Sequence, residues 1–271
     1  MDIESQNKLL ELLHESDSEK KIKISRDKII PFLDDTIRLL LIDYLSKSYN
    51  DNDVRQLFYK VKSEVLNLFT ISGSASVDTD TDSFMDELPK LRELLMGSAK
   101  AIFDGDPASD SIQEIVLSYP GFHAITYYRI AHEFYLRGQP FLARLISEEA
   151  HMLYGIDINP GAVIGKNFFI DHGTGIVIGE TAIIGDNVKL YQGVTLGALS
   201  LKKGHLLKGS KRHPTVEDDV TIYSNASIFG GDTILGKGST IGANTYLIKS
   251  IPSNSRVYLN DQGMTITKTK E

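Results

Sequence analysis

The chain has 271 residues, no cysteine and a formal net charge of −7, and 41% of its residues are hydrophobic. The lack of cysteine excludes disulfides, thiolate metal sites and a thiol nucleophile. The acidic balance argues against nucleic acid as the main ligand, and no apolar run approaches the roughly 20 residues that a membrane span needs. Residues 1–6 contain no basic region of the kind that begins a signal peptide. We therefore expect a cytoplasmic protein of one large or two modest domains.

The first 155 residues have a helical period. Apolar residues recur at intervals of three and four, which predicts amphipathic helices at 30–44, 54–68, 91–102, 124–137 and 140–153. The polar segment 72–83 is predicted to be a joint between helices, and Asp106 is expected to cap the start of a helix. Residues 1–155 are thus predicted to form an α-helical domain that caps the next domain and mediates oligomerisation.

From Ile158 to Leu247 the period is six. One aliphatic column occupies positions 158, 164, 170, 176, 182, 188 and 194, and a second occupies 178, 184, 190 and 196. Because residues i and i+2 of a strand share a face, each hexad is predicted to be a short strand with two inward side chains, followed by a turn. Three hexads make a triangular coil, and stacked coils bury an aliphatic prism. The predicted fold class is α+β, a helical bundle followed by a left-handed parallel β-helix over residues 156–257.

Two breaks interrupt the six-residue period. The second column continues through 216, 222 and 228, but its next members, at 235, 241 and 247, lie one residue later than a strict period of six requires. This shift predicts a one-residue bulge near Gly231 to Thr233. The second break, at 200–214, is too long and too basic for the corner of a coil, and it contains Lys202, Lys203, Lys208, Lys211 and Arg212. Long loops on a rigid scaffold are usually functional, so we interpret this inserted loop as a binding element for an anionic ligand. A tolerated surface insertion is the alternative. Residues 258–271 form a C-terminal tail.

Candidate chemistry gathers at the start of the solenoid. Asp157 precedes His172 by fifteen residues, close to the roughly eighteen of one coil. The Asp157 carboxylate is therefore predicted to accept the Nδ1 hydrogen bond of His172, which leaves the other ring nitrogen as a base. The alternative is a histidine that only bonds a neighbouring carbonyl. Arg212 and His213, at the end of the inserted loop, offer a cation suited to a carboxylate and a second imidazole.

Several motifs together resemble one family. They are Asp157-Ile-Asn-Pro-Gly-Ala, Asp171-His-Gly-Thr-Gly-Ile-Val-Ile-Gly-Glu180, Val194-Thr-Leu-Gly, Arg212-His-Pro, Asp106-Pro-Ala, and Gly121-Phe-His-Ala followed by Tyr-Arg-Ile-Ala-His132. From about Asp104 to Pro252 the chain closely resembles the serine O-acetyltransferases. The resemblance implies acetyl transfer from acetyl-CoA to the hydroxyl of L-serine, giving O-acetyl-L-serine and CoA in cysteine biosynthesis. It also implies a homotrimer with active sites between subunits, or a dimer of trimers, and L-cysteine as a feedback inhibitor.

The resemblance also implies roles for individual residues. The positions that match are His172 as general base, Asp157 as its orienting partner, Asp106 and Asp171 for the serine ammonium group, Arg212 for the serine carboxylate, and His213 as a second side chain at the substrate pocket. Backbone N–H groups can stabilise an oxyanion. The coenzyme positions expected from the family are Ala198 as oxyanion donor and the turn amides of Ser224, Gly242 and Ala243. No metal is expected.

Three features depart from the family pattern. The usual Gly-Ala-Gly-Ala coenzyme turn is here Tyr223-Ser-Asn-Ala226. The inserted loop is about six residues longer than the family leads us to expect. The tail lacks the terminal isoleucine that docks many members into O-acetylserine sulfhydrylase. Because burying the charge of Glu271 is unfavourable, no stable complex with that enzyme is expected. Ile266 as an internal anchor is the alternative.

Other functions fit parts of the pattern. An acetyltransferase acting on another hydroxyl or amino acceptor, such as a sugar, would keep the fold and the histidine base. It leaves the set of Asp106, Asp171 and Arg212 unexplained. A β-helix carbonic anhydrase needs several histidines around zinc, whereas the solenoid offers only His172, His205 and His213. A non-catalytic scaffold does not require the Asp157 and His172 arrangement.

Overall fold

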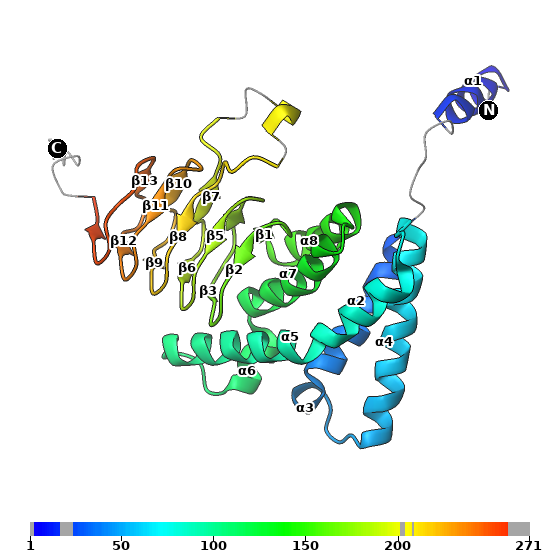
Figure 1. Ribbon diagram of the computed structural model, residues 1–271, viewed down its shortest axis with the longest axis horizontal. Helices are drawn as coiled ribbons and strands as arrows, with labels where there is room; N and C mark the ends of the chain where they lie inside the picture. The colour runs from blue at the N-terminus through cyan, green and yellow to red at the C-terminus, as the bar shows by residue number, and fades with distance from the viewer. Residues whose placement is uncertain (1–2, 17–23, 201–203, 208, 260–271) are drawn as a thin grey trace, which may run out of the picture.

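The computed structural model describes residues 3–16, 24–200, 204–207 and 209–259 (Figure 1). Lys202, Lys203, Lys208, Ile266 and Glu271, on which parts of the sequence interpretation rest, lie outside these ranges. The helices are α1 (Ile3–Ser16), α2 (Arg26–Leu40), α3 (Ile42–Leu45), α4 (Asp51–Ser72), α5 (Val77–Gly105), α6 (Ile112–Ser118), α7 (Pro120–Leu136) and α8 (Pro140–Tyr154). A parallel β-solenoid follows, as predicted. No helix of the described residues is apolar over a length that would cross a membrane.

The predicted joint at 72–83 is wrong over most of its length, because α5 already begins at Val77. Gly73 ends α4 with a left-handed φ of 79°, and only residues 73–76 separate the two helices. The polar residues that suggested a loop instead stabilise the first turn of α5. Two acids lie in that turn, where the helix dipole favours negative charge, and the Thr81 hydroxyl donates to the carbonyl of Val77 at 2.7 Å.

Three parallel sheets form the sides of the solenoid. Sheet A has the order β1-β4-β7-β10-β13, sheet B β2-β5-β8-β11, and sheet C β3-β6-β9-β12-β14. The strands are β1 (Asp157–Ile158), β2 (Val163–Ile164), β3 (Phe169–Asp171), β4 (Val177–Ile178), β5 (Ile183–Ile184), β6 (Lys189–Tyr191), β7 (Thr195–Gly197), β8 (Thr215–Val216), β9 (Thr221–Ile222), β10 (Ser227–Phe229), β11 (Ile234–Leu235), β12 (Thr240–Ile241), β13 (Tyr246–Leu247) and β14 (Arg256–Val257).

Two edges of the prism matter for function. The C–A corner consists of the turns that follow sheet C strands, 172–176, 192–194, 223–226 and 242–245. The A–B corner consists of turns that follow sheet A strands, and it includes 179–182 and the inserted loop, which leaves after β7 and returns at β8. Sheet A separates the two corners within one subunit. In the loop, residues 204–207 form a short 3₁₀ helix.

Two buried columns fill the prism, but one predicted column has the wrong phase. Ile158 pairs with Ile178, so positions 158, 164 and 170 belong with the column 178, 184, 190 and 196. The column through Ile176 instead continues back to residues that are completely buried, at positions 156, 162 and 168. The cause is the turn that begins at His172. Residues of β1 pair with β4 residues 20 positions on, whereas β4 and β7 pair at a distance of 18. This turn is therefore two residues longer than its neighbour.

The predicted one-residue bulge is confirmed between β10 and β11. Thr221 pairs with Thr240, 19 positions on, and the additional residue lies in the turn that contains Gly231. Thr233 is buried there, and its hydroxyl donates to the carbonyl of Phe229 at 2.7 Å. The buried hydroxyl is thus satisfied where the aliphatic column is interrupted.

Helix α7 covers the open end of the first coil. The Tyr128 hydroxyl donates to the carbonyl of Ala162, and the Arg129 guanidinium donates to the carbonyl of Ile164, each at 2.6 Å. Both side chains are buried. The first coil has no preceding coil to pair with, so these donors satisfy carbonyl groups that would otherwise be orphaned. The same packing brings the helical residues near Asp106 to the start of the solenoid.

Candidate active site

The C–A corner of the first coil presents Asp171 and His172. Asp171 ends β3, and His172 opens the elongated turn with a left-handed φ of 57°. One Asp171 carboxylate oxygen, Oδ1, accepts the His172 backbone N–H at 2.7 Å and lies 3.5 Å from Nδ1 of the same ring. The imidazole is 68% exposed. An accessible ring with an adjacent carboxylate is suited to proton transfer.

Asp106 joins this corner from the end of α5, and its predicted role as a helix N-cap is wrong. Its Oδ1 accepts the backbone N–H of Ala108 at 2.9 Å, and its Oδ2 accepts the Tyr119 hydroxyl at 2.6 Å. Ser111, not Asp106, caps the next helix. The Tyr119 hydrogen bond, followed by that of Ala108, lowers the pKa of Asp106, and the nearby His172 acts in the same direction. The carboxylate is therefore held ionised beside the imidazole.

The A–B corner gathers a second set of polar groups. The guanidinium of Arg212 pairs with the carboxylate of Glu180, and both side chains are about one-fifth exposed. Burial alone would raise the pKa of Glu180, but the hydrogen bond and charge of Arg212 lower it. The Thr181 hydroxyl accepts the backbone N–H groups of Arg212 and His213 at 2.9 and 3.1 Å. The end of the inserted loop is thus fixed to the coil next to it.

His213 is buried and neutral. The backbone N–H of Thr181 donates to its Nδ1 at 3.0 Å, so the ring carries its proton on Nε2. Burial, together with the charge of Arg212, lowers the pKa of His213 to about 4. The ring lies directly on Gly179, where an added Cβ would come within 2.0 Å of Cδ2. His213 is therefore equipped to donate a hydrogen bond and poorly equipped to act as a base.

The predicted hydrogen bond between Asp157 and His172 is not formed. The Asp157 carboxylate instead accepts from Nη1 of Arg144 at 3.2 Å. Arg144 lies on α8 and also pairs with Glu148. The prediction assumed a coil of about eighteen residues, whereas the residue stacked on Asp157 is Val177, 20 positions on. The elongated turn therefore places His172 further from that stacked position than was assumed. Asp171 is the carboxylate that approaches Nδ1 of His172 in this structure.

Glu148, His151 and Asp157 bring their ligand atoms within 4.8 Å of one another. Such a set has the composition of a metal site. The guanidinium of Arg144 already pairs with both carboxylates of the group, so a fixed cation compensates their charge. We assign no metal to this group.

The predicted coenzyme positions divide between the corners. Ser224, Gly242 and Ala243 lie on the C–A corner, on coils beyond His172, whereas Ala198 lies on the A–B corner. The N–H of Gly242 donates to the carbonyl of Val257 at 2.7 Å, so this amide is already used, contrary to expectation. Within the described residues, no hydrogen-bond acceptor takes the N–H of Ser224 or Ala243. The Tyr223 ring stacks on Tyr191, with centroids 5.1 Å apart and planes at 11°.

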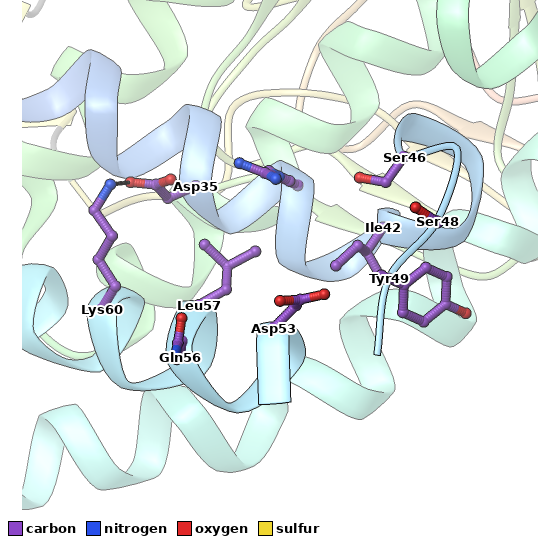
Figure 2. Close-up of a pocket in the computed structure, with 10 residues that line it drawn as sticks. Asp35, Ile42, Ser46, Ser48, Tyr49, Asp53, Gln56, Leu57 and Lys60 are labelled. Carbon is purple, nitrogen blue, oxygen red and sulfur yellow. Dashed lines mark ion pairs between the residues drawn. The ribbon is translucent and has the colours of Figure 1, made fainter. Parts of the chain in front are cut away.

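A cavity of about 270 Å³ lies elsewhere, between α2, α3 and α4 of the helical domain (Figure 2). Its lining includes Arg38 and Asp53 as well as the ion pair between Lys60 and Asp35. No residue that the sequence assigned to the site lines this cavity. The candidate chemistry therefore lies on the solenoid corners rather than in this hollow.

Sequence reasoning assigned no role to Tyr119, Glu180 or Thr181. Glu180 ends the Asp171-His172 motif, so its place there was a usable signal. Tyr119 directly precedes the Pro120-Gly121 helix start, but nothing in its spacing indicates that its hydroxyl reaches Asp106, thirteen residues earlier. That contact depends on how the α6 and α7 helices fold back on the end of α5.

A solenoid in which each coil consists of three six-residue repeats, with an accessible imidazole and ionised carboxylates at one corner and a buried neutral imidazole beside an arginine at another, defines an acyltransferase of the hexapeptide-repeat class. No protein-family model matches the chain. Serine acetyltransferases nevertheless match it in sequence. The chain is 48% identical to the enzyme of Bacillus subtilis over 164 residues, 60% of this chain and 72% of that protein.

A serine acetyltransferase of Synechococcus elongatus, designated plasmid, is 52% identical over 178 residues. The match spans 65% of this chain but only 56% of that relative. Among solved structures, serine acetyltransferase 1 of Entamoeba histolytica in complex with L-cysteine has a TM-score of 0.79 and 36% identity, with 84% of this chain and 86% of that one covered. The serine complex of the Neisseria gonorrhoeae enzyme has a TM-score of 0.59 and 28% identity, with 83% and 93% covered. The chain belongs to the serine acetyltransferase family, which confirms the predicted family, fold class and acyltransferase class.

Proposed function

We propose that the chain transfers the acetyl group of acetyl-CoA to the hydroxyl of L-serine, giving O-acetyl-L-serine and CoA in cysteine biosynthesis. The observation that carries this proposal is the joint placement of Asp106, Asp171 and His172 at the first C–A corner. Two carboxylates can bind the ammonium group of an amino acid, and the exposed imidazole beside them can remove the proton of its hydroxyl. A sugar acceptor gives no use for the paired carboxylates.

In the proposed reaction, His172 removes the proton of the serine hydroxyl as Oγ attacks the thioester carbonyl carbon. Serine's hydroxyl is a weak nucleophile at neutral pH, so this proton transfer is needed. The C–S bond then breaks, and the CoA thiolate leaves and takes the proton. Asp106 and Asp171 hold the ammonium group, and Asp157 remains the proposed partner of the imidazole once the substrates are bound.

Arg212 and His213 complete the proposed site from a second subunit. Within one subunit they lie across sheet A from His172. A head-to-tail ring joins two different patches of identical subunits, so a homotrimer places the A–B corner of one subunit beside the C–A corner of the next. Arg212 then binds the serine carboxylate, and the Nε2–H of His213 donates to the substrate. A homotrimer and a dimer of trimers both satisfy this arrangement, and sedimentation distinguishes them.

The same arrangement accounts for the divided coenzyme positions. Acetyl-CoA is proposed to lie in the groove between subunits, with the free amides of Ser224 and Ala243 on one wall and Ala198 on the other. L-cysteine shares the ammonium and carboxylate groups of serine, so it is proposed to inhibit by competition for Asp106, Asp171 and Arg212. The family member crystallised with L-cysteine supports this view.

A substrate panel tests the activity. The protein is incubated with acetyl-CoA and separately with serine, threonine, homoserine and amino sugars, and free thiol is measured. Serine is expected to give the highest rate, and a higher rate with an amino sugar would reject the proposal. The shared site is tested by mixing His172→Asn subunits with Arg212→Ala subunits under exchange. A mixed trimer contains some sites with both native corners, so partial activity is expected, whereas none returns if each site lies within one subunit.

A further inference from the structure

Tyr119 lies beside the proposed ammonium site but belongs to none of the roles assigned so far. Its hydroxyl donates to Oδ2 of Asp106 at 2.6 Å, short for a hydrogen bond between oxygens and typical of a charged acceptor. The other oxygen, Oδ1, accepts the backbone N–H of Ala108. Both carboxylate oxygens therefore have a fixed donor, and the carboxylate has one defined orientation.

The backbone on both sides of this pair is fixed to β3. At Gly105, just before Asp106, an added Cβ would meet the Phe169 ring at 2.6 Å. At Gly121, two residues after Tyr119, an added Cβ would meet the carbonyl oxygen of Ile170 at 2.4 Å. Phe169 and Ile170 are the two strand residues directly before Asp171. Such close approaches require glycine, so Asp106 and Tyr119 are both built against the strand that carries Asp171.

We propose that Tyr119 is a positioning residue that orients the Asp106 carboxylate toward the ammonium group of the amino-acid substrate. This inference rests on the proposed function, because it takes Asp106 as an ammonium-binding group. Tyr119 touches neither the reacting hydroxyl nor the thioester. Its removal should therefore weaken the binding of serine, and of its competitor L-cysteine, while the chemical step and the binding of acetyl-CoA persist.

The test is Tyr119→Phe, which keeps the ring and removes the donor. A hydrogen bond to a charged group contributes enough to predict a rise of about 10-fold in KM for serine, with kcat and the KM for acetyl-CoA within about twofold. Tyr128→Phe is the matched control, since it removes an equally short bond of 2.6 Å, to a backbone carbonyl of the first coil. The control is expected to lower Tm and leave the KM for serine unchanged.

A double-mutant cycle separates positioning from general loosening. In an Asp106→Asn background, Tyr119→Phe should have no further effect on the KM for serine, because the charged acceptor is gone. An equal additional rise in that background would overturn the proposal, as would parallel increases in both KM values in the single variant. If the wild-type protein acetylates no serine, the proposed function fails first. If it does acetylate serine and Tyr119→Phe leaves its KM unchanged, only this inference fails.

Discussion

The guanidinium of Arg144 pairs with the carboxylate of Asp157, with 3.2 Å between Nη1 and Oδ1, and so ties helix α8 to the first strand of sheet A. Both side chains are partly exposed, so the pair itself contributes no more than about 1 kcal/mol to stability. Asp157 thus has a structural partner as well as a proposed catalytic one. Separate mutation of Asp157 and of Arg144 distinguishes the structural role from the catalytic one.

Asp157→Asn is expected to lower kcat by about tenfold or more, because the charge proposed to stabilise the imidazolium of His172 is lost. Arg144→Gln breaks the same ion pair but keeps the carboxylate, so kcat should stay within about twofold of wild type. Both variants should show a similar small decrease in Tm. Steady-state kinetics and thermal unfolding measure the two effects. Equal losses of kcat would show that Asp157 acts only through its contact with Arg144.

His172→Asn is expected to lower kcat by about 10² to 10⁴-fold through loss of the general base. Asparagine is chosen because position 172 has a φ of 57°, and the other described non-glycine residues of the solenoid with a left-handed φ are asparagine at positions 167, 187, 225, 244 and 254 and aspartate at 219. The side chain is largely exposed, so Tm should change little, and calorimetry should still detect L-cysteine binding. Substantial residual activity in a folded variant would remove His172 from the mechanism.

The repeat made the solenoid predictable, because a six-residue period of aliphatic residues fits a stack of short strands and little else. The same regularity concealed the site. Isoleucines at 158, 164, 170 and 176 continue the period smoothly across the elongated turn, so composition gives no sign that two residues are inserted at His172. Strand pairing is needed to detect the shift, because only the registers of β1 with β4 and of β4 with β7 reveal it.

The sequence motifs identified the site residues, but they did not identify the side chains that pair with those residues in the structure. Asp106, Asp157 and Arg212 lie in recognisable motifs, whereas their partners Tyr119, Arg144 and Glu180 reach them through tertiary packing. Arg144 lies on α8 at a partly exposed position, and its pairing with Asp157 follows from where that helix ends, at Tyr154 with Gly155 as its C-cap, shortly before β1. The separation of Arg212 from His172 likewise depends on which corner each turn occupies. The sequence alone does not give the register of the coils, so it does not show which corner each turn occupies.

Arg212→Lys is expected to raise the KM for serine by about tenfold or more, because lysine keeps the charge but loses the planar fork that binds a carboxylate through two bonds. The KM for acetyl-CoA should change much less. Arg26→Lys is a matched control, since Arg26 forms a comparable two-bond pair with Glu149 in the helical domain. A larger effect on the KM for acetyl-CoA would assign Arg212 to the coenzyme.

His213 is expected to make the protein sensitive to mild acid. Its pKa is about 4 in the folded state and about 6.5 in an unfolded chain. Between these values the unfolded state binds a proton that the folded state excludes, so stability is lost as the pH falls. The expected contribution is about 2 kcal/mol between pH 7 and pH 5. In His213→Asn, a carbonyl replaces Nδ1 as the acceptor for the Thr181 N–H and does not titrate. The free energy of unfolding is measured in urea at pH 7 and at pH 5. Its decrease between the two pH values should be smaller in the variant than in wild type by about 2 kcal/mol. Equal decreases in both proteins would refute the assignment of His213 as a buried neutral ring.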